Sequence, residues 1–227
     1  MITFQDLCLD VADPHVAAAF WGPALGLRPD PDRPECLTDG VAEHSLWLNA
    51  VPEPRTVKHR VHLDVHVAAV SDLVDLGAQV LDDSQRWTVM ADPEGGELCA
   101  FVRDPETLRD YRLYEVVVDS ADPAAIATWW ADRFGVPVQH GTDPDDGEFS
   151  WLVGAPGPPF EMVFGEVPEP KTAKNRLHWD VRGDVDELLA AGARLLREPD
   201  GDIRWHILAD PEGNEFCVFP PQSADGS

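Results

Sequence analysis

The sequence predicts an α+β protein that contains two tandem copies of one domain. Segment 51–65, VPEPRTVKHRVHLDV, returns at 167–181 as VPEPKTAKNRLHWDV, with ten of fifteen residues identical. Segment 87–102 returns at 205–220 with nine of sixteen residues identical. The two offsets, 116 and 118 residues, are nearly equal, which indicates that a whole domain was duplicated. Within each copy the apolar spacing alternates between two and about 3.6 residues, the periods of strands and helices.

Each copy is predicted to begin with a strand and a helix. Residues 3–11 have the pattern of a strand, and the Asp-Pro pair at 13–14 then supplies an N-cap and a first-turn proline. We expect this helix to end at Gly26. The Asp-Pro pair at 122–123 opens the equivalent helix of the second copy, which is expected to end near Gly135.

A second strand-and-helix unit follows in each copy. Short strands end at 45–51 and 161–167, and the next strand covers 60–67 or 176–183. Its helix is followed by two strands around a DPEG turn, in which Asp caps the bend, Pro sets φ and Gly closes it. Each copy therefore consists of two βαβββ units, and turn chemistry alone accounts for the DPEG motif.

The domain boundaries follow from the repeat. We expect the first domain at 1–102, a charged linker at 103–112, the second domain at 113–220 and a flexible tail at 221–227. Copies of about 105 residues are long enough for each to bury a core of its own.

The composition excludes several partners. A net charge of −25 argues against binding to nucleic acid or to an anionic membrane, because both would repel the surface, whereas a cationic ligand is compatible with it. We expect no signal peptide and no membrane span, since no apolar run is long enough. The four cysteines have no CxxC spacing, which favours reduced thiols in a cytoplasmic protein.

A His-x-Asp pair is repeated on the strand that opens the second unit of each copy. Residues two apart on a strand share a face, so His62 and Asp64 project together, as do His178 and Asp180. Apolar residues flank both pairs, which predicts one packed face and one face that lines a cavity. The pattern has no G-x-S-x-G, P-loop, dinucleotide or H-E-x-x-H motif beside it.

The order of an ADP-helix-LG opening, a KNRLHWDV strand and an ADPEGNEFC ending resembles the vicinal oxygen chelate superfamily, the glyoxalase and bleomycin-resistance fold. It is most similar to a glyoxalase-like branch common in actinobacteria, over residues 2–102 and 113–220. The resemblance implies that the two half-units of one domain curl into a U-shaped, partly open barrel that holds a metal and a substrate. It implies no particular reaction, since one fold hosts many functions.

The resemblance also implies metal-ligand positions on three strands of each domain. In the two copies these positions are filled by Asp6 and Glu115, by His62 and His178, and by Cys99 and Cys217. A fourth position falls near Asn49 in the first copy and Gly165 in the second, so the first copy has the fuller polar set. Because carboxylates and thiols replace the usual ligands, we expect a divalent metal (zinc, nickel, manganese or iron) to be bound weakly or not at all.

Two functions remain open at this stage. One is a lyase or isomerase in which a metal, or His62 or His178 backed by a carboxylate such as Asp64 or Asp180, removes a proton next to a carbonyl group and stabilises the enediolate. The other is a non-catalytic protein that sequesters a toxic natural product, as bleomycin-resistance proteins do. Either would bind a small molecule, as a monomer that is an internal pseudo-dimer or as a homodimer.

Several of these residues also have structural interpretations. The histidines are equally compatible with buried hydrogen-bonding roles, and a cysteine in an apolar strand most often behaves as a small hydrophobe. Asn49, Trp87 and Trp205 are candidates for ligand contact, although both tryptophans also suit a core. A Lys-x-Arg pair precedes each His strand, at 58–60 and 174–176, and we expect it to form structural ion pairs with local acids.

Overall fold

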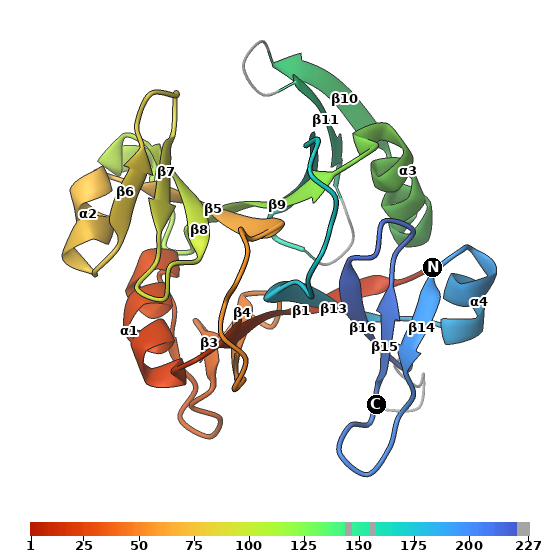
Figure 1. Ribbon diagram of the computed structural model, residues 1–227. Helices are drawn as coiled ribbons and strands as arrows, with labels where there is room; N and C mark the ends of the chain where they lie inside the picture. The colour runs from red at the N-terminus through yellow and green to blue at the C-terminus, as the bar shows by residue number, and fades with distance from the viewer. Residues whose placement is uncertain (144–146, 155–157, 222–227) are drawn as a thin grey trace.

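The computed structural model describes residues 1–143, 147–154 and 158–221. Within these residues the strands form two sheets of eight strands each. Figure 1 shows that each sheet bends about its central pair of strands. This architecture confirms the predicted α+β class with two partly open, U-shaped sheets. Except for Pro221, the tail predicted to be flexible lies outside the described residues.

Sheet A contains, in order across the sheet, β14 (Arg194–Arg197), β15 (His206–Ala209), β16 (Glu215–Phe219), β13 (Leu177–Arg182), β1 (Thr3–Val11), β4 (Ser45–Ala50), β3 (Cys36–Thr38) and β2 (Arg28–Pro29). Sheet B contains β10 (Val138–Asp143), β11 (Gly147–Leu152), β12 (Glu161–Glu166), β9 (Leu113–Ser120), β5 (Val61–Val67), β8 (Glu97–Val102), β7 (Thr88–Ala91) and β6 (Gln79–Asp82). The helices are α1 (Pro14–Leu25), α2 (Val70–Asp75), α3 (Pro123–Phe134) and α4 (Val185–Ala190), with a short 3-10 helix at Pro105–Thr107.

Each sheet combines half of one copy with half of the other. In sheet A, β1 of the first copy runs antiparallel to β13 of the second, with Cys8 opposite His178. In sheet B, β5 of the first copy runs antiparallel to β9 of the second, with Asp64 opposite Glu115. The expectation that both half-units of one copy share a barrel is therefore wrong, although each sheet does contain two such half-units.

The segments that join the half-units account for this exchange. Residues 51–60 and 167–176 lead from one sheet to the other, and both begin Val-Pro-Glu-Pro. Proline fixes its own φ and keeps the preceding residue extended, so the chain continues away from β4 or β12 instead of turning back. Because the copies are so similar, the half-unit of either copy can complete a sheet. The boundaries at 102 and 113 stay a prediction.

The two long helices begin and end as predicted. The Asp13 side chain accepts hydrogen bonds from the first-turn backbone of α1, and Asp122 does the same for α3. Gly26 and Gly135 end the helices with φ of 74° and 72°, a left-handed conformation that glycine adopts without a steric penalty. A Cβ at Gly26 would also collide with the carbonyl oxygen of Asp110, so no other residue fits there.

The DPEG turns connect the two sheets within each copy. Asp92 accepts backbone hydrogen bonds inside its own turn, as expected, but its second carboxylate oxygen also accepts the indole N–H of Trp21 from α1 at 3.2 Å. Asp210 and Trp130 repeat this bond at 3.1 Å. Glu94 adds bonds from the backbone just before α1. Turn chemistry therefore explains only part of this motif.

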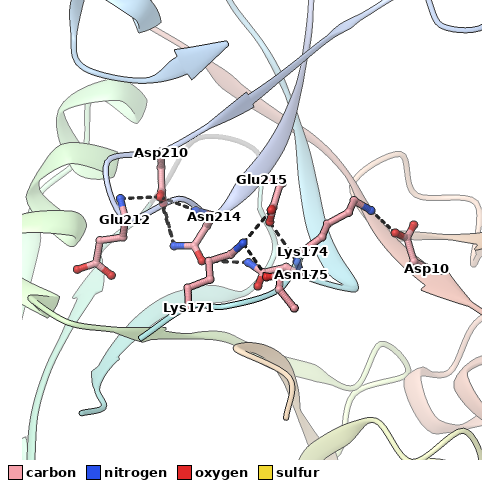
Figure 2. Close-up of polar contacts among 9 residues, drawn as sticks. Asp10, Lys171, Lys174, Asn175, Asp210, Glu212, Asn214 and Glu215 are labelled. Atoms are coloured by element: carbon pink, nitrogen blue, oxygen red, sulfur yellow. Dashed lines mark hydrogen bonds and ion pairs between the residues drawn. The ribbon is translucent and has the colours of Figure 1, made fainter. Parts of the chain in front are cut away.

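The lysines that precede the His strands bind the opposite copy. Lys58 Nζ lies 3.1 Å from Asp119, and Lys174 pairs with Asp10 across the interface (Figure 2). Structural ion pairs are thus confirmed for both lysines, but their partners are acids of the opposite copy instead of local ones, so the pairs join the copies to each other. Figure 2 also shows Lys171 bound to Glu215, at 2.7 Å, within the second copy.

Arg60 and Arg176, the arginines of the two Lys-x-Arg pairs, bind backbone carbonyl groups of the opposite copy or of its connecting segment. Arg60 donates to Asp119 and Glu169, and Arg176 donates to Asp10 and Glu53. A cavity of about 840 Å³ lies between these two segments. No helix in the described part of the chain is long and apolar enough to cross a membrane.

Candidate functional site

One face of each sheet is apolar and packs against helices, and the opposite face is polar. On β13, Trp179 and Val181 lie in the hydrophobic core, so His178 and Asp180, which alternate with them, point to the other face. The same alternation holds on β5. We call the polar face of sheet A cup A and that of sheet B cup B.

Cup A brings Cys8 of β1 together with His178 and Asp180 of β13. One sulfur, nitrogen or oxygen atom of each lies within 4.8 Å of the others, and the residues are only 6, 8 and 6% exposed. Among the described residues, His178 Nδ1 and Asp180 Oδ1 are buried without a hydrogen-bond partner. Buried polar atoms are normally paired, so a bound ligand would complete this arrangement.

Burial sets the protonation states in cup A. It lowers the pKa of His178 to about 4, so the imidazole is neutral at pH 7. It raises the pKa of Asp180 to about 7, with the Asp6 carboxylate adding to the rise and the Cys217 thiol opposing it. Burial also raises the pKa of Cys8, and the charge of Asp180 adds to that effect. At pH 7, cup A therefore contains a neutral imidazole, protonated thiols and an Asp180 carboxyl group that is about half ionised, because its pKa is about 7.

Two other predicted residues lie at the edges of cup A. Asp6 accepts a hydrogen bond from the hydroxyl of Ser45 on β4. Asn49, also on β4, donates from its amide to Asp10 at 3.5 Å. Asp10 in turn pairs with Lys174, so Asn49 belongs to the network that joins the two copies.

Cup B contains a paired histidine. His62 Nε2 lies 3.1 Å from Asp64 Oδ1 and 3.6 Å from the sulfur of Cys99. Burial opposes the charged imidazole, but the Asp64 carboxylate and the hydrogen bonds with Asp64 and Cys99 raise the pKa of His62 well above its ordinary value. His62 is therefore an imidazolium at pH 7. Its Nδ1 is buried without a partner among the described residues.

A carboxyl group with a strongly shifted pKa lies opposite the partner of this histidine. Glu115 of β9 stands opposite Asp64 across the sheet. Burial, followed by the charge of Asp64, raises the pKa of Glu115 to about 7, while His62 acts in the opposite direction. A carboxyl group that titrates near neutral pH can both accept and return a proton under physiological conditions.

Aromatic side chains line the sides of cup B. Trp87 stacks on Phe101 with ring centroids 5.7 Å apart, and His66 stacks on Tyr114 at 4.3 Å. On the opposite side of cup B, Phe149 and Trp151 of β11 stack with their ring centroids 5.4 Å apart. In cup A, Trp205 repeats the stacking of Trp87, on Phe219 at 5.1 Å. Trp87 and Trp205, the two predicted ligand-contact tryptophans, are half-buried and pack on the last strand of their own copy, β8 and β16 respectively.

The exchange of half-units redistributes the metal positions that the resemblance implied. Asp6 and Asn49 of the first copy lie in the cup of His178 and Cys217, whereas Glu115 lies in the cup of His62 and Cys99. The interpretation that one copy holds the fuller set is therefore wrong, because neither copy forms a cup alone. Cup A has the fuller set.

Cys8 is a site residue that sequence reasoning missed. It lies two residues after Asp6 on the same strand, so strand alternation places both side chains on one face, and this signal was present in the sequence. The corresponding residue of sheet B is Val117, opposite His62. A comparison of the two copies alone gave no reason to single out a cysteine that only one of them contains.

Comparisons with known proteins place this geometry in a family. A family model described as a glyoxalase-like domain matches residues 6–101 and again 115–219. Glyoxalase I from Zea mays has 14% identity and a TM-score of 0.71, with 96% of this chain and 92% of that chain covered. The cppA protein from Streptococcus pneumoniae TIGR4 has 12% identity and a TM-score of 0.50, with 96 and 98% covered. These similarities show a shared fold, and no curated protein matches the chain.

Proposed function

Because the chain belongs to the glyoxalase-like domain family, we propose that it binds a small molecule in each cup and acts in cup B as a lyase or isomerase that moves a proton next to a carbonyl group. The observation that carries this proposal is the position of Glu115 directly opposite Asp64, the carboxylate that pairs with His62. Glu115 is a carboxyl group with a pKa of about 7, and His62 is a buried imidazolium.

The two groups have complementary roles in such a reaction. Glu115 in its ionised form accepts the proton from the carbon atom, and its pKa near 7 allows it to return that proton. His62 donates a hydrogen bond to the carbonyl oxygen as negative charge develops there, which stabilises the enediolate. Asp64 is a positioning residue, since its contact at 3.1 Å keeps His62 charged and oriented.

A metal does not fit cup B as it stands. His62, Asp64 and Cys99 have suitable atoms within 4.8 Å of one another. However, the imidazole is already paired with Asp64, and a metal ligand must be deprotonated. The proton transfer in cup B therefore depends on the side chains alone.

Deuterium exchange from solvent tests the proposal and does not require the product to be identified. A panel of small α-hydroxycarbonyl and 2-oxo compounds is incubated with the protein in D₂O, and label next to the carbonyl is followed by NMR. We expect exchange with at least one compound, and its loss in Glu115→Gln. The matched control is Asp6→Asn, which changes the equivalent position of cup A. Full exchange in Glu115→Gln would contradict the proposal.

A second function is favoured by the aromatic sides of cup B. The stacked pairs Trp87–Phe101 and Phe149–Trp151 offer planar apolar surfaces, and acidic groups lie between the two wings. A planar cationic natural product suits that combination. In this case a ligand raises the melting temperature without turnover. The melting shift then disappears in Trp87→Ala but not in Trp205→Ala.

A further inference from the structure

One arginine lies at the same end of each cup, although the two arginines come from different positions of the repeat. In cup B, Arg103 follows β8, and its Cζ atom lies 5.5 Å from the centre of the Phe101 ring. In cup A, Arg182 of β13 lies over Phe219 in the same way, at 5.8 Å. The two phenylalanines are equivalent residues of the repeat, whereas the two arginines are not.

Both guanidinium groups also use the same hydrogen-bond acceptor. Arg103 donates to the carbonyl oxygen of Val102, and Arg182 donates to that of Pro220, both at 3.2 Å. Val102 and Pro220 are again equivalent residues of the two copies. Two different positions of the repeat thus bring a guanidinium group to one point of the fold. This coincidence favours a role for the charge itself at that point.

Strand alternation places both arginines on the polar face of their sheet. In cup B, Cys99 and Arg103 are four residues apart, and the backbone N–H of Arg103 continues the strand pairing to the carbonyl of Val67. In cup A, Arg182 is two residues after Asp180 on β13. Since Cys99 and Asp180 point into their cups, the two arginines point the same way.

Neither arginine has a carboxylate partner among the described residues, although the chain has 42 acidic side chains against 17 lysines and arginines. Both are partly buried. A guanidinium group has five N–H donors, and each of these two forms one hydrogen bond, to a backbone carbonyl. The planar donor pair that is left on each group matches the two oxygens of a carboxylate.

The surroundings of Arg103 suit an acid with a flat apolar body. Tyr114 of β9 also lies 5.5 Å from the Cζ atom of Arg103, and it stacks on His66 at 4.3 Å. Burial lowers the pKa of His66, and the charges of Arg103 and Arg109 lower it further. His66 is thus neutral at pH 7, so arginine supplies the positive charge at this end of cup B.

We propose that each cup recognises the carboxylate group of its ligand through this arginine, Arg103 in cup B and Arg182 in cup A, and that the ligands are small organic acids. The inference rests on the proposed function in one respect, because that function places a small molecule in each cup. It does not depend on the reaction.

The geometry of cup B also sets the length of the acid. Cys99 lies beside Asp64, and Asp64 lies opposite Glu115, so these three residues mark one level of the sheet. Phe101, which carries the guanidinium of Arg103, is two residues further along β8, or roughly 7 Å. The substrate of cup B is therefore an acid whose carboxylate and reacting carbonyl group lie at opposite ends of the molecule.

Three naphthalene compounds that differ in one group test the inference: 2-naphthoate, the neutral 2-naphthamide and the cationic 2-naphthylmethylamine. Each is titrated against the full-length protein by calorimetry. The net charge of −25 repels anions, so a preference for the acid has to come from a local positive group. We expect one site in each cup, with the acid bound about 10 to 100-fold more tightly than the amide. Equal affinity for acid and amide, or tightest binding of the amine, would overturn the inference.

Methionine variants assign the preference to the arginines. Arg103→Met and Arg182→Met remove the charge but keep a long side chain on the phenylalanine, so each should lose the preference for the acid at one site and retain the affinity for the amide there. Arg103→Lys should recover part of it. The matched control is Arg133→Met, which removes a guanidinium group 5.6 Å from the ring of Trp129 on α3, on the helix side of the sheet. A double variant of Arg103 and Arg182 that still prefers the acid would contradict the assignment.

The inference and the proposed reaction can fail separately. Glu115→Gln should lose the deuterium exchange but keep the preference for the acid, because it removes a negative charge from cup B. If the acid is preferred and no keto acid exchanges, the reaction is wrong and the carboxylate site stands. If keto acids and their amides exchange with equal KM, the reaction stands and Arg103 has no part in recognition.

Discussion

Cup A and cup B come from the same strands of one repeat, yet they hold their histidines in opposite charge states. His178 in cup A is neutral, because burial lowers its pKa to about 4. His62 in cup B is charged, because Asp64 lies 3.1 Å from it and raises its pKa. The His-x-Asp motif is identical in both. The charge state therefore follows from the orientation of the pair, and a motif alone does not specify the chemistry.

The neighbouring strands account for this difference. In cup A, Asp180 is opposite Cys217 of β16, and one of its carboxylate oxygens lies within 4.8 Å of the sulfur of Cys8. In cup B, Val117 replaces Cys8, and Asp64 instead contacts His62. The aspartate of the His-x-Asp pair thus has thiol neighbours in cup A and contacts the imidazole in cup B. Duplication left the fold unchanged while a few substitutions changed what each cup can bind.

The largest expected effect is the loss of proton exchange when the Glu115 carboxyl group of cup B is removed. Glu115→Gln should reduce proton exchange by about 10² to 10⁴-fold, the typical contribution of a general base. In the wild type, the exchange rate should rise with pH through about 7 as Glu115 ionises. Initial rates by NMR between pH 5 and pH 9 would measure both effects. A profile that is flat across pH 7 would assign the base to another group.

Stability against pH tests the raised pKa of Asp180. A carboxyl group whose pKa is raised from 3.8 to about 7 binds more protons in the folded state than in the unfolded state over that range. The free energy of unfolding therefore falls as the pH rises from 4 to 7, by up to about 4 kcal/mol from this group. In Asp180→Asn this contribution is absent. Urea titrations of the metal-free proteins at several pH values would show the difference between variant and wild type, and a constant difference would contradict the shift.

The paired and unpaired histidines should differ in their contributions to stability. His62→Ala leaves the buried Asp64 without its partner and should destabilise the protein by about 3 kcal/mol. His178→Ala removes a neutral ring that takes part in no ion pair within the described part of the chain, and it should cost about 1 kcal/mol. Urea unfolding at pH 7 measures both. Equal losses would show that Asp64 does not depend on His62.

The smallest effect comes from giving cup B a residue of cup A. Gly165 occupies the position of Asn49, its backbone φ lies outside the range that requires glycine, and a Cβ there would meet nothing within 4 Å. Gly165→Asn should therefore change the free energy of unfolding by less than about 0.5 kcal/mol. A melt within a few degrees of the wild type is expected. A large loss of stability would mean that the position is more crowded than the backbone indicates.

Much of the fold could be predicted from local rules. Asp13 caps α1 and Gly26 ends it because these residue types suit those backbone conformations in almost any context. Strand alternation likewise placed His62 and Asp64 on one face. The partnership between half-units could not be predicted, because the repeat makes two half-units almost equally suitable partners for β1. Only long-range contacts, such as Lys174 with Asp10, distinguish them.

The sequence by itself determined the duplication, the α+β class, the helix ends and the polar face of each His strand, since all of these depend on residues close together in the chain. Tertiary structure alone decided which half-units share a sheet, that Cys8 meets His178, and which histidine carries a charge. The physical reason is that a pKa or a ligand set depends on the groups within a few ångströms. Here the nearest groups to each histidine include residues from the other copy, more than a hundred positions away in the sequence for the pair Cys8 and His178.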